Sequence, residues 1–190
     1  MIQSGTPHSA VLSRSARLAE TPAVILPPVR LLVAKAQAPL AGELTIPPSK
    51  YHAHRALMLA ALADGESFIT QRTSARHVTF TVQALRALGA KVEPAGDGWR
   101  VTGGAGTFSP HSDEVSVGSS GTTLYFLLGL AALGDRPVRI VGQRYFRRRP
   151  IGPLLRALKR MGIRLEYEGQ HLPVTVYPGP SAATLVSLRM

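Results

Sequence analysis

Residues 46–65 read IPPSKYHAHRALMLAALADG, a proline-terminated turn followed by a helix of small and apolar residues. The same plan returns at residues 117–134, which read VGSSGTTLYFLLGLAALG. The Leu-Ala-Ala-Leu ends of the two helices begin at Leu59 and Leu130, an offset of 71 residues. Both helices are apolar on nearly every face, so both are predicted to be buried. A period this long exceeds that of a solenoid repeat and indicates a duplicated supersecondary module.

Each copy of the module is predicted to contain a strand, a helix, a strand, a second helix and two strands, which makes the chain an α/β (α+β) protein. The second helices show apolar residues at 3.6-residue spacing, and Gly89 and Gly162 follow as C-terminal caps. The two copies are predicted to span about residues 42–104 and 115–178. The expected first strands are Thr45–Ile46 and Val115–Val117, the first helices lie at about 52–63 and 122–133, the middle strands at about 67–70 and 137–141, and the closing strands at 91–93, 99–102, 164–167 and 174–177.

The chain has 190 residues, of which 45% are apolar and 17% are charged, so it can bury a core as one ordinary domain or at most two small ones. The absence of cysteine excludes disulfides, thiolate metal sites and a cysteine nucleophile. The longest apolar run, 124–133, is well short of the roughly 20 residues of a membrane-spanning helix, so no membrane partner is expected.

The ends of the chain differ in composition from the repeat. Residues 1–28 are rich in Ser, Ala, Thr and Pro and are predicted to be a disordered tail. Arg14 and Arg17 resemble the basic residues of a transit peptide, but no apolar signal core follows them, and a cytoplasmic location is expected. The predicted domain spans 29–180 and begins with a short strand at 29–36, and 181–190 form a second tail.

The net charge of +11 indicates an anionic partner, which could be nucleic acid, anionic lipid or a phosphorylated metabolite. Ten basic residues lie between Arg136 and Arg164, and this window contains no acid. The run is either a solvated basic face or an anion site at Arg147–Arg149. Nucleic acid is the less favoured partner, because only Tyr145 and Phe146 interleave with these arginines.

Three helix starts are candidate anion sites, because free backbone N–H groups and the helix dipole favour negative charge there. Lys50 opens the first helix, and Arg55 lies near the same end. The segment Ser120-Gly121-Thr122 opens the equivalent helix of the second copy and permits close backbone approach. Arg149 precedes Pro150, which is predicted to be near the first position of the next helix. The alternative for each site is an ordinary cap or a surface charge.

Three histidines are candidate metal ligands. His52 and His54 are two residues apart and so do not share a helix face, and neither has an acid nearby. His77 stands alone. A metal site is therefore the weaker reading, and no metal or organic cofactor is expected.

These segments resemble the 5-enolpyruvylshikimate-3-phosphate synthase family over about residues 30–180. The stretch that begins at Gly42 and ends in Pro-Pro-Ser-Lys is similar to the opening of that family, with an arginine five residues after the lysine. Ser120-Gly121-Thr122 is similar to its Asn-Ala-Gly-Thr turn, and Arg149-Pro150-Ile151-Gly152 to its Arg-Pro-Ile-Gly segment. The resemblance implies an inverse α/β barrel in which each of two domains contains three copies of the module.

The resemblance also implies a reaction in the chorismate (aromatic amino acid) pathway, the transfer of the enolpyruvyl group of phosphoenolpyruvate to the 5-hydroxyl of shikimate 3-phosphate. By resemblance Lys50 is catalytic and contacts phosphoenolpyruvate and the accepting hydroxyl, and Arg55 holds the shikimate carboxylate. Gly121, Thr122 and Arg149 bind phosphoenolpyruvate. Tyr51 stands in the shikimate site, where the family usually has serine.

Further departures from the family affect the expected substrate and activity. The family's helical asparagine is Ala53 or His54 here, an acidic pair is replaced by Arg76-His77, and an arginine is replaced by Tyr125. The alternatives are therefore a diverged homologue acting on a shikimate-like acid in specialised metabolism, or a non-catalytic basic module binding anions or RNA. The chain holds two modules, so it is expected to be an N-terminal or truncated form, inactive without a C-terminal domain.

Overall fold

The computed structural model describes residues 42–179, and residues 44–179 belong to one compact unit. The predicted tails at 1–28 and 181–190 and the predicted strand at 29–36 lie outside the described residues. Within 42–179, no helix has both the length and the apolar character needed to span a membrane. Apart from the first strand of the first copy, the strands and helices of this part follow the duplicated order that the sequence predicts.

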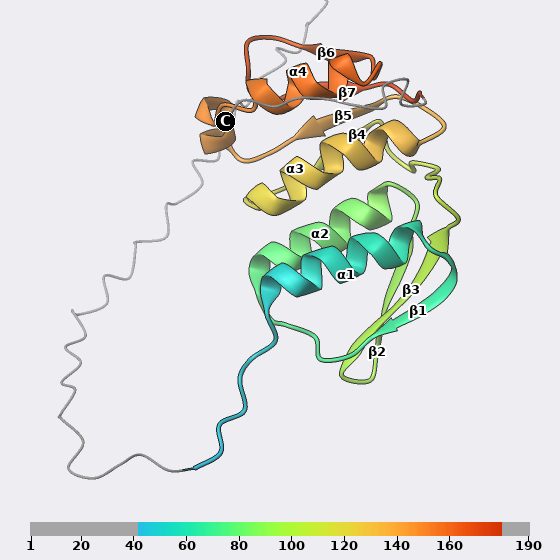
Figure 1. Cartoon of the computed structure of the whole chain (residues 1–190), viewed down its shortest axis with the longest axis vertical. Coiled ribbons are helices and arrows are strands. Elements are labelled where there is room, and N and C mark those ends of the chain that lie inside the picture. Colours follow the sequence, from blue (N-terminus) through green and yellow to red (C-terminus); the bar gives the residue numbers. More distant parts are fainter. Residues whose placement is uncertain (1–41, 180–190) are drawn as a thin grey trace, which may run out of the picture. The chain divides into compact units, whose positions relative to one another are not determined.

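The first module packs two helices against a three-stranded antiparallel sheet (Figure 1). In the sheet, β3 lies in the middle and pairs with β1 on one side and β2 on the other. The helix α2 ends at Ala87, and Gly89 follows the C-cap residue Leu88 with φ of 101°, which confirms the predicted glycine at the C-terminal cap. The elements are α1 (Lys50–Leu62), β1 (Asp64–Ile69), α2 (Arg76–Ala87), β2 (Lys91–Ala95) and β3 (Gly98–Gly104).

The second module forms a four-stranded sheet in the order β4-β5-β7-β6. Its first two strands are parallel, as a crossover through the intervening helix requires, and the other pairs are antiparallel. The elements are β4 (Glu114–Ser116), α3 (Gly121–Leu130), the short 3₁₀ helix η1 (Ala131–Leu133), β5 (Val138–Val141), the 3₁₀ helix η2 (Arg144–Arg148), α4 (Gly152–Arg160), β6 (Leu165–Tyr167) and β7 (Val174–Val176).

The predicted first strand at Thr45–Ile46 is wrong. Residues 42–49 adopt no regular structure, and the side chains of Leu44 and Ile46 are 85% and 76% exposed. The equivalent strand of the second module, β4, pairs in parallel with β5, whereas β1 pairs only with β3 among the described strands. Pro47 and Pro48 also lack the N–H groups that a ladder needs, so nothing in the described part of the chain holds this segment in a sheet.

The helices α1, α2 and α3 contact one another, and Figure 1 shows them side by side between the two sheets. Leu57, Leu85 and Leu124, one from each helix, are fully buried in the shared core. The prediction that α1 and α3 are buried all round is wrong, however, because Leu59 and Phe126 are exposed. A sequence pattern shows that a helix face is apolar, but it does not show how much of that face packs against other elements.

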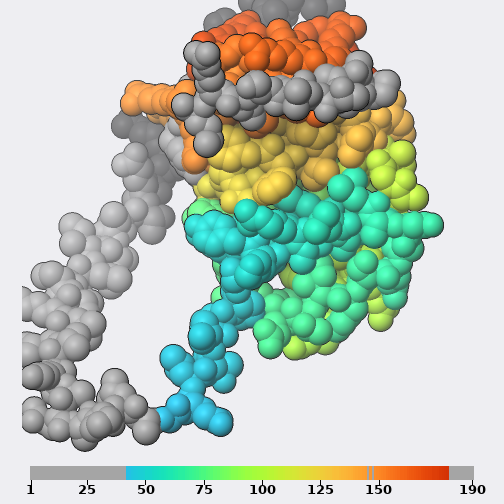
Figure 2. Space-filling model, viewed as in Figure 1, coloured from blue at the N-terminus to red at the C-terminus, as the bar shows by residue number. Residues whose placement is uncertain are grey.

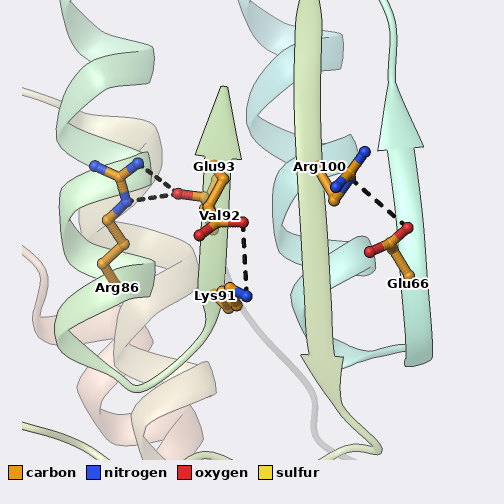
Figure 3. A network of polar contacts seen from close by, with 6 residues as sticks. All are labelled: Glu66, Arg86, Lys91, Val92, Glu93 and Arg100. Atoms are coloured by element: carbon orange, nitrogen blue, oxygen red, sulfur yellow. Dashed lines mark hydrogen bonds and ion pairs between the residues drawn. The ribbon is translucent and has the colours of Figure 1, made fainter. Parts of the chain in front are cut away.

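Polar contacts fasten the end of α2 to the first sheet (Figure 3). Arg86, in the last turn of α2, donates two hydrogen bonds to the carbonyl oxygen of Val92 in β2. On the strands, Lys91 pairs with Glu93 at 3.7 Å. A similar pair joins Arg100 of β3 to Glu66 of β1, also at 3.7 Å. These ion pairs are exposed, so each contributes little to stability. The packing of α2 on the first sheet therefore depends mainly on the Arg86 hydrogen bonds and on the buried core.

Gly103 is expected to be indispensable for the packing of α1 on β3. A Cβ atom at this position would lie 2.5 Å from the carbonyl oxygen of Ala60 and closer still to that of Ala63. Because backbone atoms cannot swing aside, we expect Gly103→Ala to lower the free energy of unfolding by about 1–3 kcal/mol. Urea unfolding of the 190-residue chain measures this.

The matched control is Gly129→Ala in α3, where a Cβ atom meets nothing within 4 Å. Alanine is a better helix former than glycine, so this variant should be more stable than the wild type by up to about 1 kcal/mol. Equal stability of the two variants would contradict the packing argument.

Candidate functional site

The start of α1 carries positive charge without an acidic neighbour. Ser49 is the N-cap residue but makes no side-chain capping bond, and the first turn contains no acid. The free N–H groups of this turn and the Lys50 ammonium therefore share one end of the helix. Arg55 donates a hydrogen bond of 2.9 Å to the carbonyl oxygen of Tyr51. The ring of Tyr51 is 56% exposed and lies 5.0 Å from the Lys50 Nζ atom, so it lines this end of the helix.

The start of α3 confirms the predicted turn. Ser120 is the N-cap, and its side-chain oxygen accepts a hydrogen bond of 3.2 Å from the backbone N–H of Thr123. Gly121 and Thr122 are the first two residues of the helix and are half-buried. Small side chains at this position leave the first backbone N–H groups accessible to a ligand.

Arg149 does not mark the start of α4, which corrects the sequence prediction. The helix α4 begins at Gly152, and the proline in its first turn is Pro153 rather than Pro150. Arg149 itself is extended, with φ of −82° and ψ of 115°, because a residue that precedes proline avoids the helical region. The Arg149 side chain, which follows η2, therefore contacts a helix other than α4.

The helix that Arg149 meets is α3. The Nε atom of Arg149 donates a hydrogen bond of 2.7 Å to the Tyr125 hydroxyl, and the guanidinium lies 5.1 Å from the centre of the same ring. Its Nη1 atom would be only 2.8 Å from a Cβ atom at Gly121. Glycine at this position thus lets the arginine lie against the first turn of α3. Arg149 therefore lies beside Gly121 and Thr122, which precede it by 28 and 27 residues in the sequence.

The ends of α1 and α3 belong to one face of the described residues. The two helices are in contact, and the Arg55 guanidinium lies 5.7 Å from the ring of Phe126 in α3. In Figure 1 both helices begin at the left, where η2 also lies. Figure 2 shows the surfaces of α1 (cyan) and α3 (yellow) meeting on the face drawn. The structure therefore places Arg55 and Arg149, predicted at separate helix starts, against the adjacent residues Phe126 and Tyr125 of α3.

Sequence reasoning missed a buried polar chain behind this face. His54 Nδ1 lies 2.6 Å from the Thr81 hydroxyl, which lies 2.6 Å from the Thr123 hydroxyl. Thr123 in turn donates a hydrogen bond of 2.7 Å to the Ser120 side-chain oxygen. The sequence presents His54 as a candidate metal ligand and as a possible match for the family's helical asparagine, and Thr81 belongs to no motif. The sequence signal for this network is a histidine at a core-facing position of a helix, because a buried imidazole needs a hydrogen-bond partner.

The environment of His54 keeps its imidazole neutral. The pKa of His54 is lowered from 6.5 to about 4, mainly by burial and in addition by the nearby charges of His77, Lys50 and Arg55. Burial disfavours the charged imidazolium because the protein interior solvates charge poorly. At neutral pH the positive charge of the face therefore comes from its lysine and arginines.

The cations of the face have no carboxylate partner among residues 42–179. In this part of the chain, the ion pairs involve Lys91, Arg100, Arg136, Arg139 and Arg164. Lys50, Arg55 and Arg149 instead contact aromatic rings. Nor do three metal-binding side chains gather anywhere within the described range. The arrangement is chemically suited to hold an anion by fixed cations and helix N-termini.

Comparison with known proteins agrees with this chemistry. The family model for EPSP synthase (3-phosphoshikimate 1-carboxyvinyltransferase) matches residues 34–190. A 3-phosphoshikimate 1-carboxyvinyltransferase of Rhizobium etli is 38% identical over 138 residues, which is 73% of this chain and 33% of the relative. One from Acetivibrio thermocellus is 43% identical over 121 residues, which is 64% of this chain and 29% of the relative.

A solved structure gives the same result for the fold. EPSP synthase from Acinetobacter baumannii superposes with a TM-score of 0.66 at 26% identity, covering 73% of this chain and 32% of that protein. The chain thus spans about a third of the length of the relatives that it matches.

Proposed function

The chain belongs to the EPSP synthase (3-phosphoshikimate 1-carboxyvinyltransferase) family, and from this premise we propose that it binds both substrates of enolpyruvyl transfer. In this proposal the enolpyruvyl group of phosphoenolpyruvate passes to the 5-hydroxyl of shikimate 3-phosphate, and phosphate leaves. The cytoplasm is the expected location. The observation that carries the proposal is the set of cations at the starts of α1 and α3 that have no carboxylate partner among the described residues.

The proposed roles follow from the position of each group. Arg149 and the N–H groups of Gly121 and Thr122 would bind phosphoenolpyruvate from two directions, since a guanidinium and a helix N-terminus both favour phosphate and carboxylate. Arg55 would hold the carboxylate of the acceptor. Lys50, at the first position of α1, would contact phosphoenolpyruvate and the accepting hydroxyl.

The reaction needs charge stabilisation more than it needs a cofactor. The acceptor oxygen bonds to the central carbon of phosphoenolpyruvate while a proton reaches the methylene carbon, which gives a tetrahedral ketal. Loss of phosphate, with a proton from the new methyl group, restores the double bond on the product. Fixed cations and helix dipoles around the phosphate would lower the energy of these steps, because they require no reorganisation as charge develops.

Arg149→Ala tests the proposed phosphoenolpyruvate site. Removal of a charge-assisted contact should weaken binding by about 1.5–3 kcal/mol, roughly 10- to 150-fold in Kd. Calorimetric titration of the 190-residue chain with phosphoenolpyruvate measures the change. The control is Arg148→Ala, which removes the same charge from an exposed neighbouring side chain and should change the Kd much less. Equal affinities for Arg149→Ala and the wild type would refute the assignment.

The identity of the acceptor has to be tested separately, because Tyr51 stands where the family usually has serine. Its exposed ring lies beside Lys50, where a larger side chain than serine narrows the space for the acceptor. The alternative is therefore a homologue that acts on a different shikimate-like acid. Titration with shikimate and with shikimate 3-phosphate, on the wild type and on Tyr51→Ser, distinguishes these acceptors. If neither acid binds to either protein, the proposed acceptor class is wrong.

The non-catalytic alternative, a basic module for RNA, has less support. Several arginines of the basic run are paired with acids that lie outside the run in sequence, which breaks up the positive face. The pairs are Arg136–Asp113 at 3.5 Å, Arg139–Glu114 at 3.8 Å and Arg164–Glu166 at 2.9 Å. Salt-dependent retention on RNA, combined with no binding of phosphoenolpyruvate, would favour this alternative.

A further inference from the structure

A continuous chain of buried side chains connects the three helices of the core. His54 of α1, Thr81 of α2 and Thr123 and Ser120 at the start of α3 are each no more than 1% exposed. Their polar atoms contact one another in that order, at 2.6, 2.6 and 2.7 Å. These hydrogen bonds run from the first module to the second. They form a direct polar connection between two parts of a core that is otherwise apolar.

The hydrogen bonds of this chain have one direction. A hydroxyl has a single hydrogen to donate, and Thr123 gives its hydrogen to Ser120. Thr81 must then donate to Thr123, which leaves its own oxygen to accept. The donor to Thr81 is therefore the Nδ1–H group of His54. The geometry assigns the neutral Nδ1–H tautomer to this histidine.

The two ends of the chain lie behind the two halves of the candidate site. His54 is on α1 between Lys50 and Arg55, and these two residues with His77 are the charged or titratable groups that act on it. Ser120 caps α3 immediately before Gly121 and Thr122. A shift of α3 along α1 would break hydrogen bonds that no water can replace in a buried setting.

We propose that His54, Thr81 and Thr123 are positioning residues of the substrate site, because they hold the Ser120 cap, and with it the N–H groups of the first turn of α3, at a fixed distance from the cations of α1. None of the three contacts the ligand in this proposal. The identity of the ligand rests on the proposed function, whereas the positioning of α3 does not.

The experiment compares Thr81→Val, which keeps the shape but cuts the chain, with Thr81→Ser, which keeps the hydroxyl. The matched control is Thr79→Val, an exposed position on the same helix. Nitrogen NMR of the wild type reports the tautomer of His54, and the amide resonances of Gly121 and Thr122 report the start of α3. Calorimetry gives the Kd for phosphoenolpyruvate.

We expect a protonated Nδ1 atom in the wild type. Thr81→Val should move the two amide resonances and raise the Kd by about fivefold to tenfold, the effect of one lost hydrogen bond. Thr81→Ser should restore both readouts, and Thr79→Val should change neither. A merely structural role of Thr81 would lower stability and leave the amides of Gly121 and Thr122 and the Kd of the folded protein unchanged.

Two results would overturn the proposal: a His54 ring protonated only at Nε2, or amides of Gly121 and Thr122 that stay unchanged in Thr81→Val. If Thr81→Val does not fold, Thr123→Val cuts the same chain nearer the cap, and the wild-type tautomer decides in either case. If the wild type does not bind phosphoenolpyruvate, the proposed function fails, while the tautomer and the amide shifts still decide the positioning role.

Discussion

The 190-residue chain, purified alone, is expected to release no measurable phosphate from phosphoenolpyruvate and shikimate 3-phosphate, although the proposed function has it bind both. The proposed reaction moves one proton off the accepting hydroxyl and another onto a carbon atom. Positioned acid and base groups typically contribute about 10²- to 10⁴-fold each. In the described part of the chain, no ion pair brings a carboxylate to Lys50, Arg55 or Arg149. Turnover should therefore fall at least about 10⁴-fold below that of a complete relative.

The measurement is a phosphate-release assay, first with the chain alone and then with the remaining two thirds of a relative supplied as a second polypeptide. Restored turnover with the added polypeptide is the expected result. Arg149→Ala in the same mixture is the control, because it should remove activity that depends on the proposed site. Robust turnover by the chain alone would contradict the argument and assign the proton transfers to a local residue, with exposed His52 a better candidate than buried His54.

Acid is expected to destabilise the fold through His54. In the unfolded chain this histidine takes up a proton near pH 6.5, whereas in the folded protein its pKa is about 4. Between these two values the unfolded state binds more protons, so stability falls as the pH falls from about 6.5 to 4. The difference of about 2.5 pKa units corresponds to a loss of roughly 3 kcal/mol.

Urea unfolding at a series of pH values tests this expectation. His54→Gln should flatten the curve between pH 6.5 and 4, because glutamine does not titrate. His52→Gln, at an exposed position on the same helix, should keep the wild-type slope. Hydrogen bonds from Tyr177 and Arg164 lower the pKa of Glu166. Protonation of Glu166 therefore lowers the stability of the fold only at more acidic pH. An unchanged slope in His54→Gln would show that other groups cause the pH dependence.

The sequence by itself determined the duplicated module, the helix start at Lys50 and the turn at Ser120-Gly121-Thr122. These features are local. A cap is made by residues within four positions of one another, and helical periodicity depends on neighbours along one helix. The same reasoning predicted the bounds of β3, β5 and β7 to within two residues. Apolar segments bounded by turn residues can be recognised without knowledge of their partner strands.

The tertiary structure alone decided which helix each cation contacts. Arg149 is adjacent to Pro150 in sequence, and this suggested a place at the start of α4, but its partners are Tyr125 and Gly121 on α3. The strand expected at Thr45–Ile46 failed for the related reason that a strand requires a partner from elsewhere in the chain. The hydrogen-bonded chain from His54 to Ser120 is a third case, since its members come from three helices. Contacts between distant segments depend on how helices and sheets pack, and no local spacing encodes that packing.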